Sequence, residues 1–260
     1  MSTKLTSLVT AHYILLVRSF IVILGCIAVW WGAVEFPAFW RESSIERIAT
    51  QIIAGAPFRA EALTLQLPAM NRIETSVYCR AAALRSATII RLRMVEVGIS
   101  ASDGKRGDEQ LVSLANMIRN SLSCGPADPF LWLVLYWVES TKNGSKADNL
   151  KYLRMSYRLG PNEGWIGLKR NRVTFTASTS LPADLTEYAV NEFAGLVEME
   201  FYDQAVEILT GPAWPLRQKL LPRLENLDMR HRVAFADALY KKGYDVAIPG
   251  IDNQNLHPRH

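Results

Sequence analysis

The stretch that decides the fold is a short pattern that the chain carries twice: RNSLSCGPADPFLW at residues 119–132 and RMSYRLGPNEGW at residues 154–165. Four residue types recur at one offset of 35 (154 minus 119), namely Arg119/Arg154, Ser121/Ser156, Gly125/Gly160 and Pro126/Pro161. A period of about 20–50 residues is typical of stacked helical units that bury a shared core. The pattern therefore predicts helical hairpins, and it does not by itself identify a ligand.

The first copy ends in the apolar run FLWLVLYWV, which extends from Phe130 to Val138. Asp128 is a good N-cap and Pro129 suits the first helical position, so we expect a helix to begin here. A buried strand is the alternative, because periodicity alone does not separate the two for an apolar run. Since the run is apolar on all sides, it belongs at the centre of the core or against a partner.

The same reading of periodicity and helix signals predicts helices along most of the remaining chain. The expected ranges are 44–53, 58–67, 74–97, 108–123 (with Asp108 as N-cap), 147–159, one beginning near Pro182, 204–209, 216–227 and 229–242. Gly-Pro dipeptides end three of them, at 125–126, 160–161 and 211–212. The third lies 51 residues after the second (211 minus 160), so the repeat is interrupted there.

Residues 13–36 form the most apolar segment, and 19–34 carry no charge. As a helix, this segment is about 36 Å long, against about 30 Å for the hydrocarbon core of a bilayer. Trp30 and Trp31 near one end, and Tyr13 at the other, suit the two interfaces. A buried core helix and a cleaved signal peptide are the alternatives, but the run is longer than the usual signal-peptide core. We expect an uncleaved signal anchor, with Pro37 marking its end.

Lys4 and Arg18 precede the uncharged run with no acidic residue among them. The positive-inside rule then places the N-terminus in the cytoplasm and the rest of the chain outside. In a bacterium this describes a single-pass inner-membrane protein with a periplasmic domain. In that oxidising compartment Cys79 and Cys124 could pair, whereas Cys26 lies in the apolar segment.

A net charge of +4 on 260 residues is mild, and no run of five or more Lys/Arg occurs, so we do not expect nucleic acid as a partner. The sequence has no phosphate loop, nucleophile elbow, zinc-protease or dinucleotide motif, and no cysteine/histidine metal spacing. We therefore expect no catalytic residue, no cofactor and no metal. Glycan cleavage by paired carboxylates remains the alternative, with Glu139 and Glu163 as the acids that lie near aromatic residues.

The repeat region resembles the tetratricopeptide repeat family, whose pattern of Trp, Leu, Ala, aromatic and Pro is matched by Trp132, Leu135, Ala147, Tyr152 and Pro161. Residues 202–209 (YDQAVEIL) resemble the second helix of another such repeat, and Tyr136 stands where the family has a small residue. The layout of an anchor plus degenerate repeats is also similar to small membrane-anchored alphaproteobacterial proteins that accompany surface-polysaccharide assembly genes. The resemblance implies an all-α scaffold that binds proteins or peptides.

The predicted organisation is all-α: a cytoplasmic tail at 1–12, a transmembrane helix at 13–36 contacting the lipid bilayer, a helical-hairpin (tetratricopeptide-like) solenoid at 37–243 and an irregular tail at 244–260. The candidate binding surface consists of Trp165, Lys169, Arg170 and Arg172, because an aromatic face beside cations suits an acidic peptide or an anionic sugar. The alternative is that Trp165 is core and the cations are solvated. The predicted function is a membrane-anchored adaptor for protein partners in cell-envelope assembly; the alternative is a periplasmic glycan-binding or glycan-cleaving protein.

Overall fold

The computed structural model describes residues 2–99, 104–144, 146–177 and 181–252. Throughout these ranges the chain forms helices joined by turns and contains no strand, so the all-α prediction is confirmed. The chain divides into two compact units, residues 1–100 and residues 101–260, which are described separately below.

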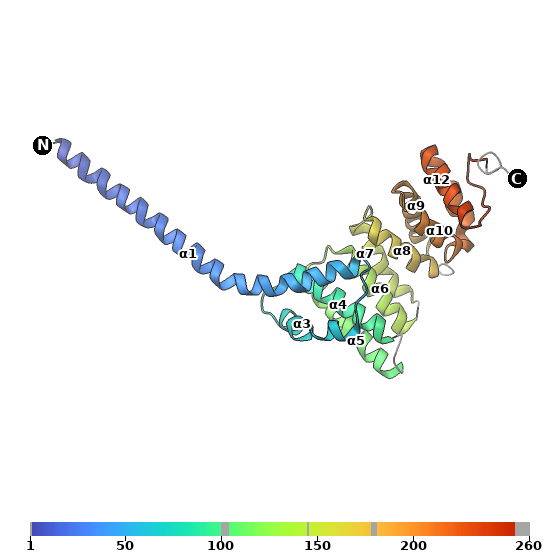
Figure 1. The fold of residues 1–260 in the computed structure, drawn as a ribbon, viewed down its shortest axis with the longest axis horizontal. Coiled ribbons are helices and arrows are strands. Elements are labelled where there is room, and N and C mark those ends of the chain that lie inside the picture. The colour runs from blue at the N-terminus through green and yellow to red at the C-terminus, as the bar shows by residue number, and fades with distance from the viewer. Residues whose placement is uncertain (1, 100–103, 145, 178–180, 253–260) are drawn as a thin grey trace. The chain divides into compact units, whose positions relative to one another are not determined.

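The first unit begins with a single helix of 52 residues, α1 (Ser2–Ile53), whose N-terminal half extends away from the other helices of this unit (Figure 1). Within it, Leu16–Phe36 has a mean hydropathy of 2.0 and none of its side chains is buried. By length and composition, these 21 residues can cross a membrane. The tryptophans near the C-terminal end of this stretch are strongly exposed, at 73% for Trp30 and 68% for Trp31.

The prediction that Pro37 separates the apolar helix from a second helix at 44–53 is wrong, because α1 continues through this position without a break. A proline inside a helix removes one backbone hydrogen bond and bends the axis, but it does not always end the helix. The ribbon of α1 changes direction near its middle (Figure 1). Beyond the bend, Ile45 and Ala49 are buried and α1 packs against α3 and α4, which stabilises the continued helix.

The remaining helices of the first unit are α2 (Ala60–Thr64), α3 (Leu67–Glu74) and α4 (Ala81–Ile99). Pro68 occupies the first turn of α3, so a helix begins where the predicted helix 58–67 was expected to end. The helix predicted from residue 74 begins only at Ala81. In the segment between residue 74 and Ala81, the Ser76 hydroxyl accepts a hydrogen bond from the Tyr78 N–H at 3.2 Å. Such local bonds compete with helix formation, which explains the late start of α4.

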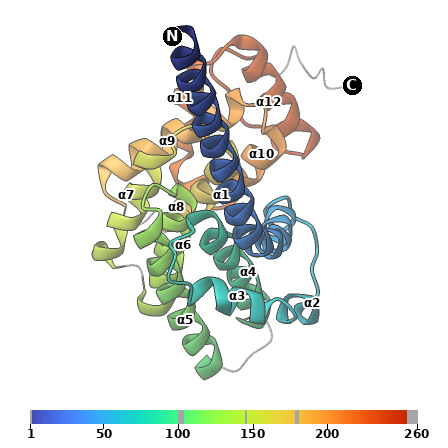
Figure 2. The same ribbon diagram turned by 90° about the vertical axis from the view of Figure 1, so that its left-hand side faces the viewer.

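The second unit contains α5 (Gly104–Cys124), α6 (Pro129–Asn143), α7 (Leu150–Leu159), α8 (Gly164–Thr176), α9 (Ala183–Glu198), α10 (Tyr202–Thr210), α11 (Arg217–Arg223) and α12 (Met229–Lys241). Short 3-10 turns lie at η1 (Ala147–Asn149), η3 (Trp214–Leu216) and η4 (Leu224–Asn226). Helix α6 packs against both α5 and α7, and Figures 1 and 2 show it beside them. Helix α9 packs against α8, α10, α11 and α12. Asp108 lies inside α5 and is not its N-cap, because α5 begins four residues earlier.

Helix α6 confirms the helical interpretation of the apolar run and excludes the strand. The Asp128 carboxylate accepts hydrogen bonds from the N–H groups of Phe130 (2.9 Å) and Leu131 (3.1 Å), and Pro129 occupies the first turn. Most of the run is buried, including Leu131, Tyr136 and Val138, so it forms the core of this part of the unit. Each of the three Gly-Pro dipeptides directly follows a helix, as predicted.

The second copy of the repeated pattern joins α7 to the start of α6. The Ser156 hydroxyl donates to the Pro129 carbonyl at 2.8 Å. A Cβ at Gly160 would lie 2.7 Å from Pro129 Cγ, so only glycine allows this approach. In the first copy, the buried Ser121 hydroxyl has no hydrogen-bond partner among the described residues. The two copies therefore share spacing but not this contact.

The repeated arginines make ion pairs with later helices of the second unit. Arg119 donates to Glu139 at 2.6 Å, and Arg154 donates to Asp184 at 2.6 Å and 3.2 Å. The hydrogen bond from Arg154 holds the pKa of the Asp184 carboxyl below its usual value. Both copies of the arginine thus tie one helix to another.

One helix end carries a conformation that is unusual for its residue type. Glu200, just after α9, has φ of 67°, and it is the only non-glycine residue with positive φ among the described residues. The Phe201 N–H bonds to the Leu196 carbonyl (3.0 Å) and the Glu200 N–H to the Val197 carbonyl (3.1 Å), which is a Schellman motif. Glycine is the preferred residue at this position because it has no Cβ.

We predict that Glu200→Gly raises the free energy of unfolding by about 0.5–1 kcal/mol, because it removes the left-handed strain of a residue with a side chain. The matched control is Glu198→Gly at the last residue of α9, which should lower it by about the same amount. Urea denaturation of the detergent-solubilised chain, followed by circular dichroism, measures both. Equal destabilisation by the two substitutions would contradict this account of the helix end.

Candidate functional site

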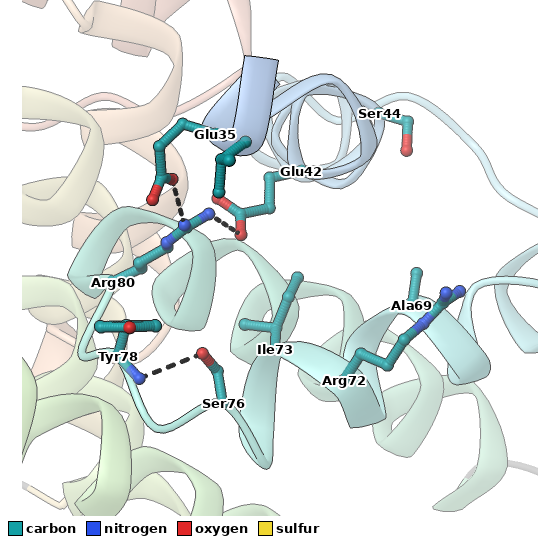
Figure 3. A pocket seen from close by; sticks show the side chains of 10 residues that line it. Glu35, Glu42, Ser44, Ala69, Arg72, Ile73, Ser76, Tyr78 and Arg80 are labelled. Atoms are coloured by element: carbon teal, nitrogen blue, oxygen red, sulfur yellow. Dashed lines mark hydrogen bonds and ion pairs between the residues drawn. The ribbon is translucent and has the colours of Figure 1, made fainter. Parts of the chain in front are cut away.

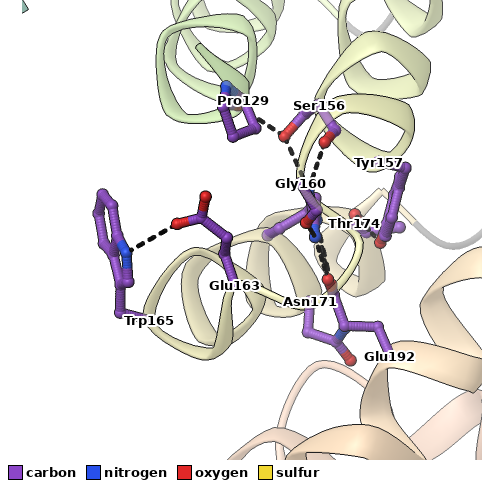
Figure 4. A network of polar contacts seen from close by, with 10 residues as sticks. Pro129, Ser156, Tyr157, Gly160, Glu163, Trp165, Asn171, Thr174 and Glu192 are labelled. Atoms are coloured by element: carbon purple, nitrogen blue, oxygen red, sulfur yellow. Dashed lines mark hydrogen bonds and ion pairs between the residues drawn. The ribbon is translucent and has the colours of Figure 1, made fainter. Parts of the chain in front are cut away.

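The four residues predicted to form a binding surface all lie on α8, but they differ in burial. Figure 4 shows Trp165 away from Asn171 and Glu192, which belong to a buried network. Arg170 is fully buried, with 0% of its surface exposed. Arg170, Asn171 and Thr174 are the polar residues of the buried face of α8, which also contains Ile166, Gly167 and Phe175. These positions have the i, i+3, i+4, i+7 spacing of a core face. Hydrophobic periodicity missed this face because half of its residues are polar.

Arg170 holds the end of α7 with its guanidinium group. Its Nη1 donates to the Ser156 carbonyl (2.6 Å) and to the Ser156 hydroxyl (3.1 Å), and its Nη2 donates to the Gly160 carbonyl (2.8 Å). These carbonyls lie in the last turn of α7 and beyond it, where a helix has unpaired acceptors and partial negative charge. Ser156 and Gly160 of the repeated pattern therefore supply hydrogen-bond acceptors for Arg170.

Glu192 of α9 supplies the opposite charge. Its carboxylate accepts from Arg170 Nε (2.9 Å and 3.2 Å) and from Arg170 Nη2, and it also accepts from Asn171 Nδ2 at 2.7 Å. A Cβ at Gly167 would lie 3.3 Å from this side chain, so the glycine leaves room for the carboxylate against α8. The network thus joins α7, α8 and α9 through one buried ion pair.

Tyr157 completes the network from α7. Its ring lies 4.4 Å from Arg170 Cζ, which is a cation–π distance, and its hydroxyl shares a hydrogen bond of 3.1 Å with the Thr174 hydroxyl. Burial raises the pKa of the Tyr157 hydroxyl above its usual value, and the nearby Glu192 carboxylate raises it further. The phenol is therefore kept neutral in the folded protein.

The other three predicted residues have different environments. Trp165 is half-buried, with its ring centre 5.1 Å from that of Phe130, and its indole N–H donates to Glu163 at 3.2 Å. Lys169 is exposed. Arg172 is also exposed and lies 3.1 Å from Glu207 of α10. The prediction of one cationic surface at these four residues is therefore corrected: Arg170 belongs to the core, and the exposed cations that remain are Lys169 and the ion-paired Arg172.

An open pocket lies beside the network, between the α7–α8 turn and α9, with a volume of about 210 Å³. Its walls include Pro161, Asn162, Glu163, Tyr188, Asn191 and Met199. Tyr188 and Met199 are 42% and 43% exposed, so the pocket presents apolar side chains to solvent. The Tyr188 ring stacks on Tyr157 at 5.3 Å, so the buried network fixes one wall of the pocket. Sequence reasoning did not identify this pocket, because its walls come from segments that are about 30 residues apart.

Glu139, one of the two acids considered for glycan cleavage, has a structural role. It is buried, accepts from Arg119 at 2.6 Å, and accepts from Asn143 Nδ2 at 3.0 Å. A general acid must reach its substrate, whereas both oxygens of this buried carboxylate already accept hydrogen bonds within the fold. Glu163 is exposed at the pocket. Glu139 is therefore poorly placed to act on a glycan.

No group of three or more His, Cys, Asp or Glu residues in the described ranges could hold a metal ion. Comparisons with protein-family models, with curated proteins and with solved structures give no match for this chain. The resemblance to tetratricopeptide repeats therefore stays a prediction that rests on the residues quoted above.

We predict that Arg170→Ala lowers the free energy of unfolding by about 3–5 kcal/mol, because it leaves the buried Glu192 carboxylate without its counter-charge. Arg170→Lys should also destabilise, since one ammonium cannot reach acceptors on α7 and α9 together. The control is the neighbouring exposed residue, where Lys169→Ala should change stability by less than about 0.5 kcal/mol. Urea denaturation measures all three, and similar values for Arg170→Ala and Lys169→Ala would contradict the structural role.

The raised pKa of Tyr157 predicts a loss of stability at high pH. The unfolded chain releases the Tyr157 proton near pH 10, whereas the folded protein retains it. The contribution of Tyr157 to the free energy of unfolding is therefore fully present below about pH 10 and falls above it. The stability difference between wild type and Tyr157→Phe should be constant from pH 7 to 9. It should then shift in favour of the variant by up to about 1.4 kcal/mol per pH unit above pH 10. A difference that stays constant through pH 11 would contradict burial of the phenol.

Proposed function

We propose that this protein is a membrane-anchored adaptor, held in the bacterial inner membrane by Leu16–Phe36, whose helical second unit binds a protein partner in a cell-envelope assembly. The observation that carries the anchor is the contrast in burial along α1. The apolar residues of Leu16–Phe36 are exposed, whereas Ile45 and Ala49 on the same helix are fully or nearly fully buried. Apolar surface exposed over a whole helix is unfavourable in water, and a bilayer covers it at this length.

The continuity of α1 supports an uncleaved anchor over a removed signal peptide. The helix passes from the apolar stretch into the packed part of the first unit without a connecting loop. Signal peptidases cleave after an apolar core at small residues in an accessible segment. Here the apolar stretch leads through Trp30 and Trp31 into a helix whose later turns are buried in the unit. With Lys4 and Arg18 on the cytoplasmic side, the chain beyond residue 36 lies in the periplasm.

The pocket between the α7–α8 turn and α9 is the proposed partner site, and its chemistry differs from that of the surface expected from sequence. The α8 arginine that would have attracted an acidic partner is neutralised inside the protein by Glu192. The pocket instead presents the Glu163 carboxylate with Tyr188 and Met199, and the exposed Glu198 and Glu200 flank Met199 along the chain. A carboxylate beside an aromatic ring suits a lysine or arginine side chain. The partner is therefore a protein segment with a basic residue beside an apolar one.

The arrangement of α5 to α9 fits the repeat interpretation. Helices that follow one another along the chain pack together, as α5/α6, α6/α7 and α8/α9 do. A hairpin of a tetratricopeptide-like array buries one face against its neighbour and leaves a surface for a peptide. In this interpretation the Ser156, Gly160 and Arg170 contacts are the joint between two hairpins, and the pocket lies beside that joint.

The test is site-specific photo-crosslinking of the full-length chain in its own membranes. The chain should stay in the membrane pellet after alkaline carbonate extraction. A benzophenone amino acid in place of Tyr188 should give a discrete protein adduct, and the matched control at Tyr240, which is 49% exposed on α12, should give none. Addition of Glu163→Gln should reduce the adduct about tenfold, because it removes the carboxylate that holds the basic residue.

Three outcomes would overturn this function. Release of the full-length chain by carbonate would contradict the anchor. Equal adducts from residues 188 and 240 would contradict the partner site. Glycan turnover by the purified chain that a single Glu→Gln substitution abolishes would replace the adaptor with an enzyme.

A further inference from the structure

The first unit contains a second pocket, of about 430 Å³, at the C-terminal end of the apolar stretch (Figure 3). Residues from α1, α3 and the segment before α4 line it: the charged ones are Glu35, Glu42, Arg72 and Arg80. Val34 and Glu35 belong to the last turn of Leu16–Phe36, so the pocket opens where the apolar stretch ends. In a bilayer that is the level of the lipid headgroups.

One wall of this pocket carries an excess of negative charge. Arg80 donates to Glu35 and to Glu42, each at 2.7 Å, so two carboxylates share one guanidinium. The two glutamates are seven residues apart on α1 and converge on Arg80 in Figure 3. All three side chains are only partly buried, and Glu35 is the most exposed of them. The Glu35 and Glu42 carboxylates can therefore accept further hydrogen bonds from a cation.

The α3 wall carries the opposite charge. Arg72 is exposed and its Nε donates to the Pro68 carbonyl at 3.1 Å. Among the described residues its two Nη groups have no carboxylate partner. Figure 3 shows Arg72 on α3, with Ile73 between it and Arg80. The pocket thus presents a negative group on its α1 side and a positive group on α3, and the formal charges of its two glutamates and two arginines cancel.

Two aromatic side chains mark the same level. Trp40 on α1 and Tyr78 before α4 are both strongly exposed, and Tyr78 lines the pocket. Tryptophan and tyrosine are enriched where the apolar core meets the headgroups, because each combines an apolar ring with a polar group. The pocket therefore combines balanced charge with residues typical of an interface.

We propose that this pocket binds the headgroup of a zwitterionic phospholipid with a primary ammonium group, as in phosphatidylethanolamine. The lipid phosphate lies at Arg72, and the ammonium donates its hydrogen bonds to the Glu35 and Glu42 carboxylates. A primary ammonium has three N–H donors, whereas the quaternary ammonium of a choline lipid has none. An anionic glycerol lipid lacks the cation and meets the excess carboxylate. The proposal rests on the proposed membrane anchor.

The test uses the full chain reconstituted into nanodiscs, with the co-purified lipid quantified by native mass spectrometry. The bilayer contains equal parts of ethanolamine, choline and glycerol phospholipids with identical acyl chains. Wild type should retain the ethanolamine lipid about tenfold over the choline lipid, because of the hydrogen bonds that only the first can donate. Glu35→Gln should reduce the preference to less than about twofold, because it removes a carboxylate that only the ethanolamine ammonium can donate to. Arg72→Gln should lower the retention of all three lipids together, because they share the phosphate, and Arg72→Lys should keep most of the retention.

The matched control for Arg72→Gln is Arg59→Gln, which removes the same charge from an exposed position of the first unit outside the pocket lining and should leave the amount of retained lipid unchanged. Equal retention of ethanolamine and choline lipids, or a preference for the glycerol lipid, would overturn the headgroup site while the anchor stands. Failure of the chain to enter nanodiscs would overturn the anchor, and the headgroup site with it. An unchanged preference in Glu35→Gln would also overturn the site.

Discussion

The second unit depends on the buried ion pair between Arg170 and Glu192. One guanidinium meets two carbonyls at the end of α7, a carboxylate on α9 and the face of Tyr157, so three helices share a single charged group. A buried charge without its partner is costly, so the ion pair favours the one arrangement of these helices in which both charges are satisfied. Because the Tyr188 ring stacks on Tyr157, the ion pair also holds one wall of the open pocket in place.

In the first unit, a single helix connects the apolar stretch to the packed helices. Helix α1 carries its apolar residues outward over Leu16–Phe36 and its packed residues inward beyond the bend, without an intervening loop. Arg80 fixes the junction by holding Glu35 at the end of the apolar stretch and Glu42 on the packed part. These two ion pairs place a mixed-charge pocket at the level where a bilayer would present its headgroups. A loop at this junction would give neither the pocket nor a fixed helix direction.

Local signals predicted much of this fold. Asp128 and Pro129 fixed the start of α6, and the three Gly-Pro dipeptides correctly marked three helix ends, because caps and proline act within a few residues. The prediction that the helix ends at Pro37 was wrong, because the packing of Ile45 and Ala49 stabilises the continued helix by more than the one lost hydrogen bond costs. The site was harder to predict: nothing in Lys169-Arg170 tells which cation turns inward, since that depends on Glu192 and Ser156, 22 and 14 residues away. Patterns that treat arginine as exposed cannot find a polar core face.

The central claim is that one uninterrupted helix leaves the bilayer and becomes part of the folded domain. Nitroxide side chains placed one at a time from residue 16 to residue 53 of the full chain in nanodiscs test it most directly. The account predicts access to oxygen but not to a water-soluble nickel complex over most of 16–36. Beyond residue 42, nickel access should vary with a period of about 3.6 residues and be lowest at positions 45 and 49. Nickel access throughout 16–36, or no helical period beyond residue 42, would contradict it.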